Sequence, residues 1–301
     1  MMQTNVPSST TEDALQVLAE ALETLAPEPR KAGCYILENP NEVSVSSVRE
    51  LAEAADVKPN TLVRMARSIG FEGYEDFREP FREAVRRGQV SFPDRARWLQ
   101  AAREEGRLGE LYADMVSATL DNLETTFAGI DAEQLKAAGE AIWASRNTFT
   151  LGVGVHTSNA QNFTYLASTG MLQFSAIPKT GSTAIDDLAW ADERDVLIAI
   201  TCKPFRREVV EAVRVAKEQG MTVIGISDSA ASPVITEADH GFVVGVETPQ
   251  FFPSSVAIIG LLETLLSFVI AAASPNIVDR VRQFHRRRHE LGLYEQDVSQ
   301  T

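Results

Sequence analysis

The spacing of apolar residues divides the chain into two parts. Up to about residue 130, apolar positions recur every three or four residues, which is the period of an amphipathic helix. After Asp131, short apolar runs alternate with helical stretches, and runs such as VLIAI and TVIGI are apolar at nearly every position. Strands covered on both faces have this composition. We therefore predict an N-terminal all-α domain followed by a three-layer α/β/α domain with a parallel sheet.

The same patterning predicts where the elements lie. Five strands are expected over 148–153, 172–177, 195–200, 222–226 and 242–246. Helices are expected over 14–25, over 29–38, over 71–88 and, without interruption, over 95–129. The chain then divides into a helical domain over 1–90, a helical connector over 91–130, the α/β domain over 131–275, and a basic helix and tail over 276–301.

Residues 46–71, SSVRELAEAADVKPNTLVRMARSIGF, have the pattern of two short helices joined by a tight turn. Ser47 and Glu50 have the spacing of a capping box, which predicts that the first helix begins there. Asp56 turns the chain, Pro59 suits the first position of a second helix, and Gly70 ends that helix. This arrangement is typical of a helix-turn-helix.

The second helix of this pair is expected to turn a positive and polar face outward. Its inward residues are expected to be Leu62, Val63, Ala66 and Ile69. The outward residues are of the kinds that contact phosphates and base edges: Lys58, Asn60, Thr61, Arg64 and Arg67. An ordinary helical pair with a solvated polar face is the alternative. Because no acidic residue interrupts this face in a strongly acidic chain, we interpret it as a surface for double-stranded DNA.

A glycine-rich turn, GVGVHTS, follows the first predicted strand and enters a helix. Ligands bind outside the carboxyl ends of parallel strands, and a helix N-terminus favours an anion. We therefore assign Gly152, Gly154, His156 and Thr157 to a ligand site. A dinucleotide site is the weaker alternative, because the third glycine of that motif and the acidic residue after the second strand are both missing. We expect no cofactor.

Cations and a hydroxyl follow the third predicted strand, again at the start of a helix. Thr201, Lys203 and Arg206 lie in this loop, and Ser254 and Ser255 precede the last apolar helix. Lysine and arginine beside a helix N-terminus suit a phosphate or a carboxylate. Charges that only solvate a loop are the alternative. We predict that the two loops and these serines bind a small anion.

Net charge and cysteine content narrow the class of protein. The chain has 301 residues and a formal net charge of −14, so any contact with nucleic acid must come from a local patch. It has two distant cysteines and an N-terminus without the pattern of a signal peptide, which predict a reducing cytoplasm. The apolar run 256–273 carries Glu263, and we expect it inside a core or a subunit interface of a homodimer or homotetramer, without a membrane.

Taken together, the two halves resemble the RpiR family of bacterial transcription regulators, which join a helix-turn-helix domain to a sugar isomerase (SIS) domain. The matching features are LAEAADVKPNTLVRMARSIGFEGYEDFR, the GVG turn, the DVLIAIT strand and AKEQGMTVIGISDSAASPVITEAD, and they span nearly the whole chain. The resemblance implies that the SIS domain senses a sugar phosphate or a related metabolite and alters operator binding.

The chain departs from this family at the ligand site. SIS domains often place a serine after the glycine turn and a serine-glycine pair after the third strand, where this chain has His156 and Lys203-Pro204. A sugar acid is therefore an alternative to a sugar phosphate. A SIS-fold isomerase or lyase is the alternative function, with Glu247 and His156 as its candidate acid and base. We expect a regulator and not an enzyme.

The C-terminal segment is strongly basic. His285 and His289 lie one helical turn apart in HRRRH, but the arginines between them repel a metal ion. We expect no metal there, and we predict a basic helix that contacts either DNA or the acidic surface of a neighbouring subunit.

Overall fold

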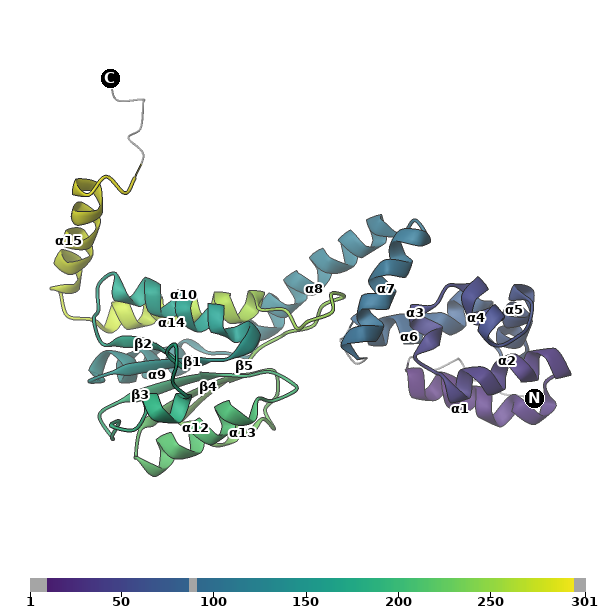
Figure 1. Ribbon diagram of the computed structural model, residues 1–301, viewed down its shortest axis with the longest axis horizontal. Helices are drawn as coiled ribbons and strands as arrows, with labels where there is room; N and C mark the ends of the chain where they lie inside the picture. Colours follow the sequence, from purple (N-terminus) through teal and green to yellow (C-terminus); the bar gives the residue numbers. More distant parts are fainter. Residues whose placement is uncertain (1–9, 87–90, 295–301) are drawn as a thin grey trace, which may run out of the picture. The chain divides into compact units, whose positions relative to one another are not determined.

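The computed structural model describes residues 10–86 and 91–294 and consists of two compact units (Figure 1). The first unit comprises Met1–Leu120 and Glu247–Ser254, and the second comprises Asp121–Val246 and Ser255–Thr301. The division falls within helix α8 (Leu108–Ala128), so the segment 91–130 is shared between the two units.

The first unit is helical, as predicted. Its elements before α8 are α1 (Thr11–Ala21), the 3-10 turn η1 (Leu22–Thr24), α2 (Pro27–Glu38), α3 (Glu42–Val45), α4 (Val48–Ala54), α5 (Pro59–Ser68), α6 (Tyr74–Arg86) and α7 (Phe92–Glu104). The short α3 was not expected from the sequence. Apolar residues from α1, α2 and α4 to α6 form one core, in which Leu18, Ile36, Leu51, Leu62 and Phe77 have no exposed surface.

The predicted uninterrupted helix over 95–129 is wrong. Gly106 adopts a left-handed conformation, with φ of 70°, and separates α7 from α8. The N–H of Gly106 donates to the carbonyl of Arg103 (3.1 Å) and that of Arg107 to the carbonyl of Ala102 (2.8 Å), which closes α7. Because glycine lacks a Cβ, it adopts this conformation at little cost, and the apolar period on either side does not reveal the break.

Residues 247–254 belong to the first unit through contacts with α7. The Arg95 guanidinium donates to the carbonyl of Gln250 (3.0 Å), and the rings of Phe92 and Phe252 lie 4.7 Å apart. Arg95 itself is buried. A segment that follows the last strand along the chain is therefore packed in the helical unit, which the sequence pattern did not indicate.

The second unit contains the predicted parallel sheet, in the order β2-β1-β3-β4-β5. The strands are β1 (Thr148–Gly152), β2 (Phe174–Ile177), β3 (Val196–Ile200), β4 (Thr222–Ser227) and β5 (His240–Val243), each within a few residues of its predicted range. Every residue of β3 is buried, because this strand is central and both faces of the sheet are covered.

Helices cover both faces of this sheet. The residues Val196, Ile198 and Ile200 of β3 pack in one core with α9 (Ala132–Ala144), α10 (Thr157–Ser168) and α14 (Val256–Ala272). The alternate residues Leu197 and Ala199 pack in a second core with α11 (Ala184–Asp187), α12 (Arg207–Glu218) and α13 (Pro233–Thr236). Figure 1 shows α10 and α14 on one side of the strands and α12 and α13 on the other. The architecture is the three-layer fold predicted.

The long apolar run forms α14, most of which is buried within its own unit. Leu261, Leu265 and Val269 lie in the core beside α9, whereas Val256 and Ile270 are partly exposed. Its apolar composition therefore has an explanation that needs no second copy of the chain. Within the described residues, no single helix has the length and apolar character to cross a membrane; α14 and α15 (Ile277–Glu290) pass that test only as a pair bent by 120°.

Candidate DNA-reading helix and ligand rim

Helix α4 begins at the predicted capping box. The N–H of Ser47 donates to a carboxylate oxygen of Glu50 (2.8 Å), and the N–H of Glu50 donates to the Ser47 hydroxyl (3.2 Å). These hydrogen bonds favour the charged carboxylate, so the pKa of Glu50 is lowered. The start of the first helix of the pair is thus determined by local sequence.

The turn between α4 and α5 depends on a left-handed Asp56. Asp56 is the one residue other than glycine with a positive φ, 50°, in the described chain. Its N–H donates to the carbonyl of Glu53 (2.9 Å) and that of Val57 to the carbonyl of Ala52 (2.8 Å), which is the usual glycine-type closure of a helix. The Lys31 ammonium contacts the carboxylate of Asp56 and donates to its carbonyl (2.9 Å). Asp56 therefore turns the chain, as predicted.

Helix α5 exposes four of the five residues assigned to DNA. Lys58, Asn60, Arg64 and Arg67 are exposed on or just before this helix, which begins at Pro59. Arg67 also donates from Nε to the carbonyl of Glu72 (3.0 Å), so part of its guanidinium is already engaged. The described residues of α5 contain no carboxylate, and its outer face is positive.

The outward placement of Thr61 is wrong. Thr61 is 2% exposed, and its hydroxyl accepts a long hydrogen bond from Arg64 (3.5 Å). Thr61 lies one helical turn before Met65, which is fully buried, whereas Val63, expected inward, is partly exposed. Residues four apart share a helix face, so the inward face is shifted relative to the prediction. The prediction placed Thr61 by its polarity, and tertiary packing overrides polarity for a small hydroxyl side chain.

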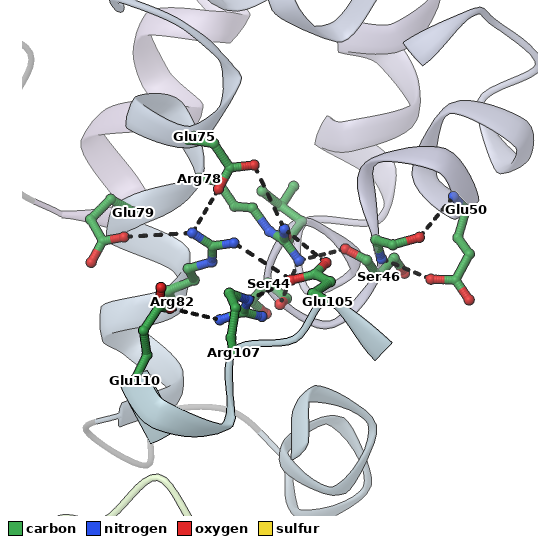
Figure 2. Close-up of polar contacts among 12 residues, drawn as sticks. Ser44, Ser46, Glu50, Glu75, Arg78, Glu79, Arg82, Glu105, Arg107 and Glu110 are labelled. Atoms are coloured by element: carbon green, nitrogen blue, oxygen red, sulfur yellow. Dashed lines mark hydrogen bonds and ion pairs between the residues drawn. The ribbon is translucent and has the colours of Figure 1, made fainter. Parts of the chain in front are cut away.

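A buried arginine holds the corner before α4 (Figure 2). Arg78, on α6, donates to the carbonyls of Val43 (2.8 Å), Ser44 (3.3 Å) and Ser46 (2.6 Å). The same guanidinium lies 3.3 Å from a carboxylate oxygen of Glu105, at the end of α7. Arg78 therefore joins the segment that leads into the helix-turn-helix to α6 and α7.

The charges around Arg78 form a network that only the tertiary structure reveals. Arg82 lies 2.7 Å from Glu75, and Arg107 lies 2.6 Å from Glu105. Figure 2 shows these side chains gathered beside Arg78 from α6 and from the residues that join α7 to α8. Arg82 is mostly buried, so the pKa of its guanidinium is lowered by desolvation and by the neighbouring Arg78. The helical period of residues 71–88 predicted the helix but gave no sign of this network.

The predicted ligand loops meet at the carboxyl edge of the sheet. Strands β1 and β3 are neighbours, with Gly152 opposite Ile200, so the residues after both strands lie side by side. In a sheet of this order, chain connections leave in opposite directions between these two strands, and ligands bind in the crevice formed there. We call this edge, formed by residues 152–157 and 201–206, the ligand rim.

Gly154 and Arg206 bring the two loops together. Gly154 is exposed and has a φ of 62°, which a residue with a side chain adopts only with strain. A Cβ at this position would lie 3.8 Å from an Arg206 guanidinium nitrogen. Helix α10 begins directly after this turn, and no side chain caps its first N–H groups. The rim therefore presents backbone donors and a guanidinium at one place.

The remaining rim residues differ in their exposure. Lys203 is exposed, and its backbone N–H donates to a carboxylate oxygen of Asp228 (3.1 Å). Thr201 has no exposed surface, and its hydroxyl accepts a hydrogen bond from the N–H of Arg206 (3.2 Å). Thr157 donates to the carbonyl of Gly152 (3.2 Å). Thr201 and Thr157 thus shape the two loops, and Lys203 and Arg206 supply the accessible charge.

His156 is buried beneath the rim. Its Nδ1 lies 3.2 Å from the side-chain amide of Asn159, which also donates to the hydroxyl of Ser255 (3.4 Å). Burial lowers the pKa of His156, and the nearby Asp228 opposes this shift only in part. His156 therefore favours the neutral form and links the glycine turn to the start of α14. Asn159 was not identified from the sequence, because an amide within a helix has no motif of its own.

A small cavity lies beside the rim and includes residues that the sequence analysis did not assign to a site. It has a volume of about 360 Å³ and lies between α10 and the ends of β1 and β2. Gly152 and Thr157 line it together with Gln161, Lys179 and Thr180. The Lys179 ammonium lies 3.8 Å from a carboxylate oxygen of Asp187, and Lys179 is exposed. The sequence offered one signal for this cavity, a lysine two residues after the second strand.

Two other residues named from the sequence, Ser254 and Glu247, lie in the segment 247–254. This segment belongs to the first unit, whereas the residues of the rim belong to the second. Cys202, one of the two cysteines, is buried within the rim, and burial raises the pKa of its thiol to about 12. A thiol of this kind is a poor nucleophile at neutral pH.

Comparison with known proteins identifies both domains. Residues 13–86 match the helix-turn-helix domain of the rpiR family, and residues 141–273 match the SIS domain. An uncharacterised HTH-type transcriptional regulator of Caldanaerobacter subterraneus is 26% identical over 295 residues, which cover 93% of this chain and 98% of that protein.

Two solved structures share the fold. The sugar isomerase domain of an RpiR transcription factor from Sphaerobacter thermophilus aligns with a TM-score of 0.55 and 23% identity, over 60% of this chain and 99% of that one. The Vibrio vulnificus NanR protein, whose structure contains ManNAc-6P, aligns with a TM-score of 0.54 and 20% identity, over 92% and 98%. The chain therefore belongs to the RpiR family and is a transcription regulator with an N-terminal helix-turn-helix domain and a C-terminal SIS domain.

Proposed function

We propose that this regulator senses a small anionic sugar-derived metabolite at the ligand rim and changes its affinity for operator DNA in response. The observation that carries the proposal is the close approach of Gly154 and Arg206. A Cβ added at Gly154 would lie 3.8 Å from a guanidinium nitrogen of Arg206. An anion at this point accepts backbone N–H bonds from the start of α10 and charge-assisted bonds from Arg206 and Lys203.

The charge of the rim favours a phosphate or a carboxylate over a neutral sugar. Lys203 and Arg206 are both exposed, and within the described residues neither side chain has a carboxylate within 4 Å. Next to them, Arg207 pairs with Glu211 (2.6 Å) and is thereby partly neutralised. Two accessible cations beside uncapped N–H groups attract a ligand of negative charge.

A sugar phosphate and a sugar acid are both candidates for the effector. The V. vulnificus NanR structure contains ManNAc-6P, which supports a phosphorylated amino sugar as the first compound to test. The hydroxyl-rich loops common in SIS domains are replaced here by His156, Lys203 and Pro204. A carboxylate accepts a forked pair of hydrogen bonds from an arginine as well as a phosphate does, so sugar acids belong in the same screen.

We propose sensing without chemical conversion. His156 is buried, its pKa is lowered, and its Nδ1 faces the Asn159 amide, which supports a structural role beneath the rim. Glu247, the other candidate for acid–base catalysis, lies in a segment of the helical unit. The related proteins that cover most of the chain are named transcriptional regulators.

In the same proposal, α5 reads the operator. Lys58, Asn60, Arg64 and Arg67 are the exposed residues assigned to it, and Thr61 is withdrawn from base contact because it is buried. An arginine is suited to guanine and an asparagine to adenine, so Arg64 and Asn60 are assigned to base edges. Lys58 and Arg67 are assigned to phosphates, which position the helix without reading sequence.

The test measures operator affinity by fluorescence anisotropy while sugar phosphates and sugar acids are titrated. An active compound should change the affinity of the parent protein, and the variant Lys203→Ala/Arg206→Ala should lose this response. Arg207→Ala is the matched control, since it removes a neighbouring cation that is already paired with Glu211. Ligand-free operator affinity should be the same in all three proteins.

Two results would contradict the proposal. If the double variant responds to the compound as strongly as the parent, the effector binds outside the rim. If mass spectrometry shows that the protein converts the compound to an isomer at a catalytic rate, the domain is an enzyme and sensing without conversion is wrong.

A further inference from the structure

Helix α15 is fixed to the second unit at the end of α10 that is remote from the ligand rim. Ile277 and Val281 of α15 pack so closely on Gly170 that a Cβ there would lie 2.9 Å and 3.0 Å from their side chains. Further along α15, Arg288 donates to the hydroxyl of Tyr165 on α10 (2.7 Å). These contacts position an arginine-rich helix against the C-terminal end of α10.

A groove of about 720 Å³ lies along this contact. This volume is within the range of small-molecule sites in proteins. The groove is separated from the ligand rim by the length of α10, whose 12 residues span about 18 Å. Its walls come from the end of α10, the residues before β2 and one face of α15: Ser168, Thr169, Gly170, Leu172, Arg280, Gln283, Phe284, Arg286, Arg287 and Glu290.

The groove carries positive charge that the protein does not neutralise. Helix α15 has five arginines against two carboxylates, in a chain whose net charge is −14. Arg287 pairs with Glu290 (3.3 Å), but within the described part of the chain no carboxylate pairs with Arg280 or Arg286. Both are exposed and line the same groove. Arg280 and Arg286 are about 9 Å apart along the helix axis, and an anion that lies between them in the groove would offset the repulsion of their like charges.

We propose that this groove binds a small molecule of nucleotide size that carries two or more phosphate groups. A guanidinium donates to a phosphate through two parallel N–H groups, so Arg280 and Arg286 together match a ligand with at least two negative charges. Arg287 adds a third guanidinium, and the Gln283 amide lies between the arginines along the helix. This site is separate from the effector site of the proposed function.

Apolar residues of the same groove favour an organic polyphosphate over the backbone of DNA. Leu172 is 89% exposed and Phe284 is half-buried, and both line the groove. A ring of the ligand would cover this apolar surface, which is costly to leave in water. Glu290 also lines the groove and disfavours a long run of phosphates across it.

The test uses the full chain and isothermal titration calorimetry with two probes, inorganic tripolyphosphate and adenosine triphosphate, in magnesium-free buffer. Both probes should bind the parent protein. Arg280→Gln/Arg286→Gln should lower the affinity for both probes by roughly tenfold or more, because the loss of one hydrogen bond to a charged group lowers affinity by about that factor. Leu172→Ala should lower the affinity for adenosine triphosphate and leave the affinity for tripolyphosphate unchanged. The difference between the two probes measures the contribution of the ring apart from that of the phosphates.

The matched control is Arg282→Gln/Arg214→Gln, which changes the net charge equally. Arg282 lies on α15 but pairs with Asp279 (2.5 Å), and Arg214 is exposed on α12; neither lines the groove. The proposal is overturned if neither probe binds the parent, or if the control loses affinity as strongly as the groove variant. It is also overturned if Lys203→Ala/Arg206→Ala abolishes binding, since the probes then occupy the ligand rim.

Discussion

Replacing Arg78 by methionine removes the buried guanidinium that joins the corner before α4 to α6 and α7. Arg78 is 1% exposed and donates to three backbone carbonyls, two of them at 2.8 and 2.6 Å. Methionine fills much of the same space without donating. The carbonyls of Val43 and Ser46 then lose their partner, and Glu105 loses one of its three arginine neighbours.

The size of this effect follows from the number of groups left without partners. Each buried acceptor that loses its donor costs about 1 to 3 kcal/mol, and removing one partner of a buried ion pair costs about 3 to 5 kcal/mol. Arg78 no longer has to be desolvated, which offsets part of this loss. We therefore expect the unfolding free energy of the helical unit to fall by about 3 kcal/mol, which lowers its Tm by roughly 10 to 20 °C.

The assay is differential scanning calorimetry of the full chain, with hydrogen exchange followed by mass spectrometry to locate the loss. Exchange should accelerate in peptides that cover α3 to α5 and stay unchanged in the sheet. Arg78→Lys should have an intermediate Tm, because an ammonium keeps the charge but lacks the forked geometry that serves several acceptors.

The control for this prediction is Arg49→Met. Arg49 is exposed on α4, and exposed substitutions of this kind usually change stability by less than about 0.5 kcal/mol. If Arg78→Met and Arg49→Met unfold at the same temperature and with the same exchange pattern, the network around Arg78 does not stabilise the corner before α4, and this reasoning is refuted.

Three further predictions concern DNA and pH. Arg64→Ala should weaken operator binding by about 1 to 3 kcal/mol and relax specificity at one base position, and an unchanged footprint would remove Arg64 from base contact. The operator should be an inverted repeat with half-site centres about 10 base pairs, or a multiple of that, apart, and a single asymmetric half-site in a footprint would count against it. Because burial lowers the pKa of His156 below its usual value of about 6.5, the unfolded chain takes up the proton first as pH falls. Stability should therefore decrease between pH 7 and pH 5.5, and His156→Gln should reduce this decrease in a thermal melt. If the variant and the parent lose stability equally over this range, groups other than His156 cause the pH dependence.

Much of the helix-turn-helix could be predicted because its signals are local. The capping box at Ser47 and Glu50, the proline at the start of α5 and the left-handed Asp56 each act through residues a few positions apart. The burial of Thr61 could not be predicted in this way. Its exposure depends on which face of α5 the other helices cover. The pattern of apolar and polar residues in α5 fits two inward faces, one position apart, almost equally well.

The sheet and the ligand rim were predictable for a different reason. Continuous apolar runs such as Val196–Ile200 occur in strands covered on both faces, and a parallel sheet brings the residues after its strands to one edge. The sequence alone therefore placed Gly154 and Arg206 near each other, and it correctly assigned them to neighbouring loops. The exposure of each rim residue was not predictable, since Thr201 is buried by its own loop and Lys203 is not.

Local sequence thus determined the helices of the first unit, the strands of the second unit and the order of the loops, because caps, turns and hydrophobic periods act over a few residues. Only the tertiary structure decided the Arg78 network, the attachment of residues 247–254 to α7 and the groove beside α15. In each of these, the interacting groups are brought together by folding from positions distant in the chain. Arg78 and Glu105 are 27 residues apart, and Gly170, in the turn after α10, packs against Ile277 of α15. From the sequence alone, charged side chains such as Arg78 are interpreted as a solvent-exposed face, and only the folded structure shows that they are buried.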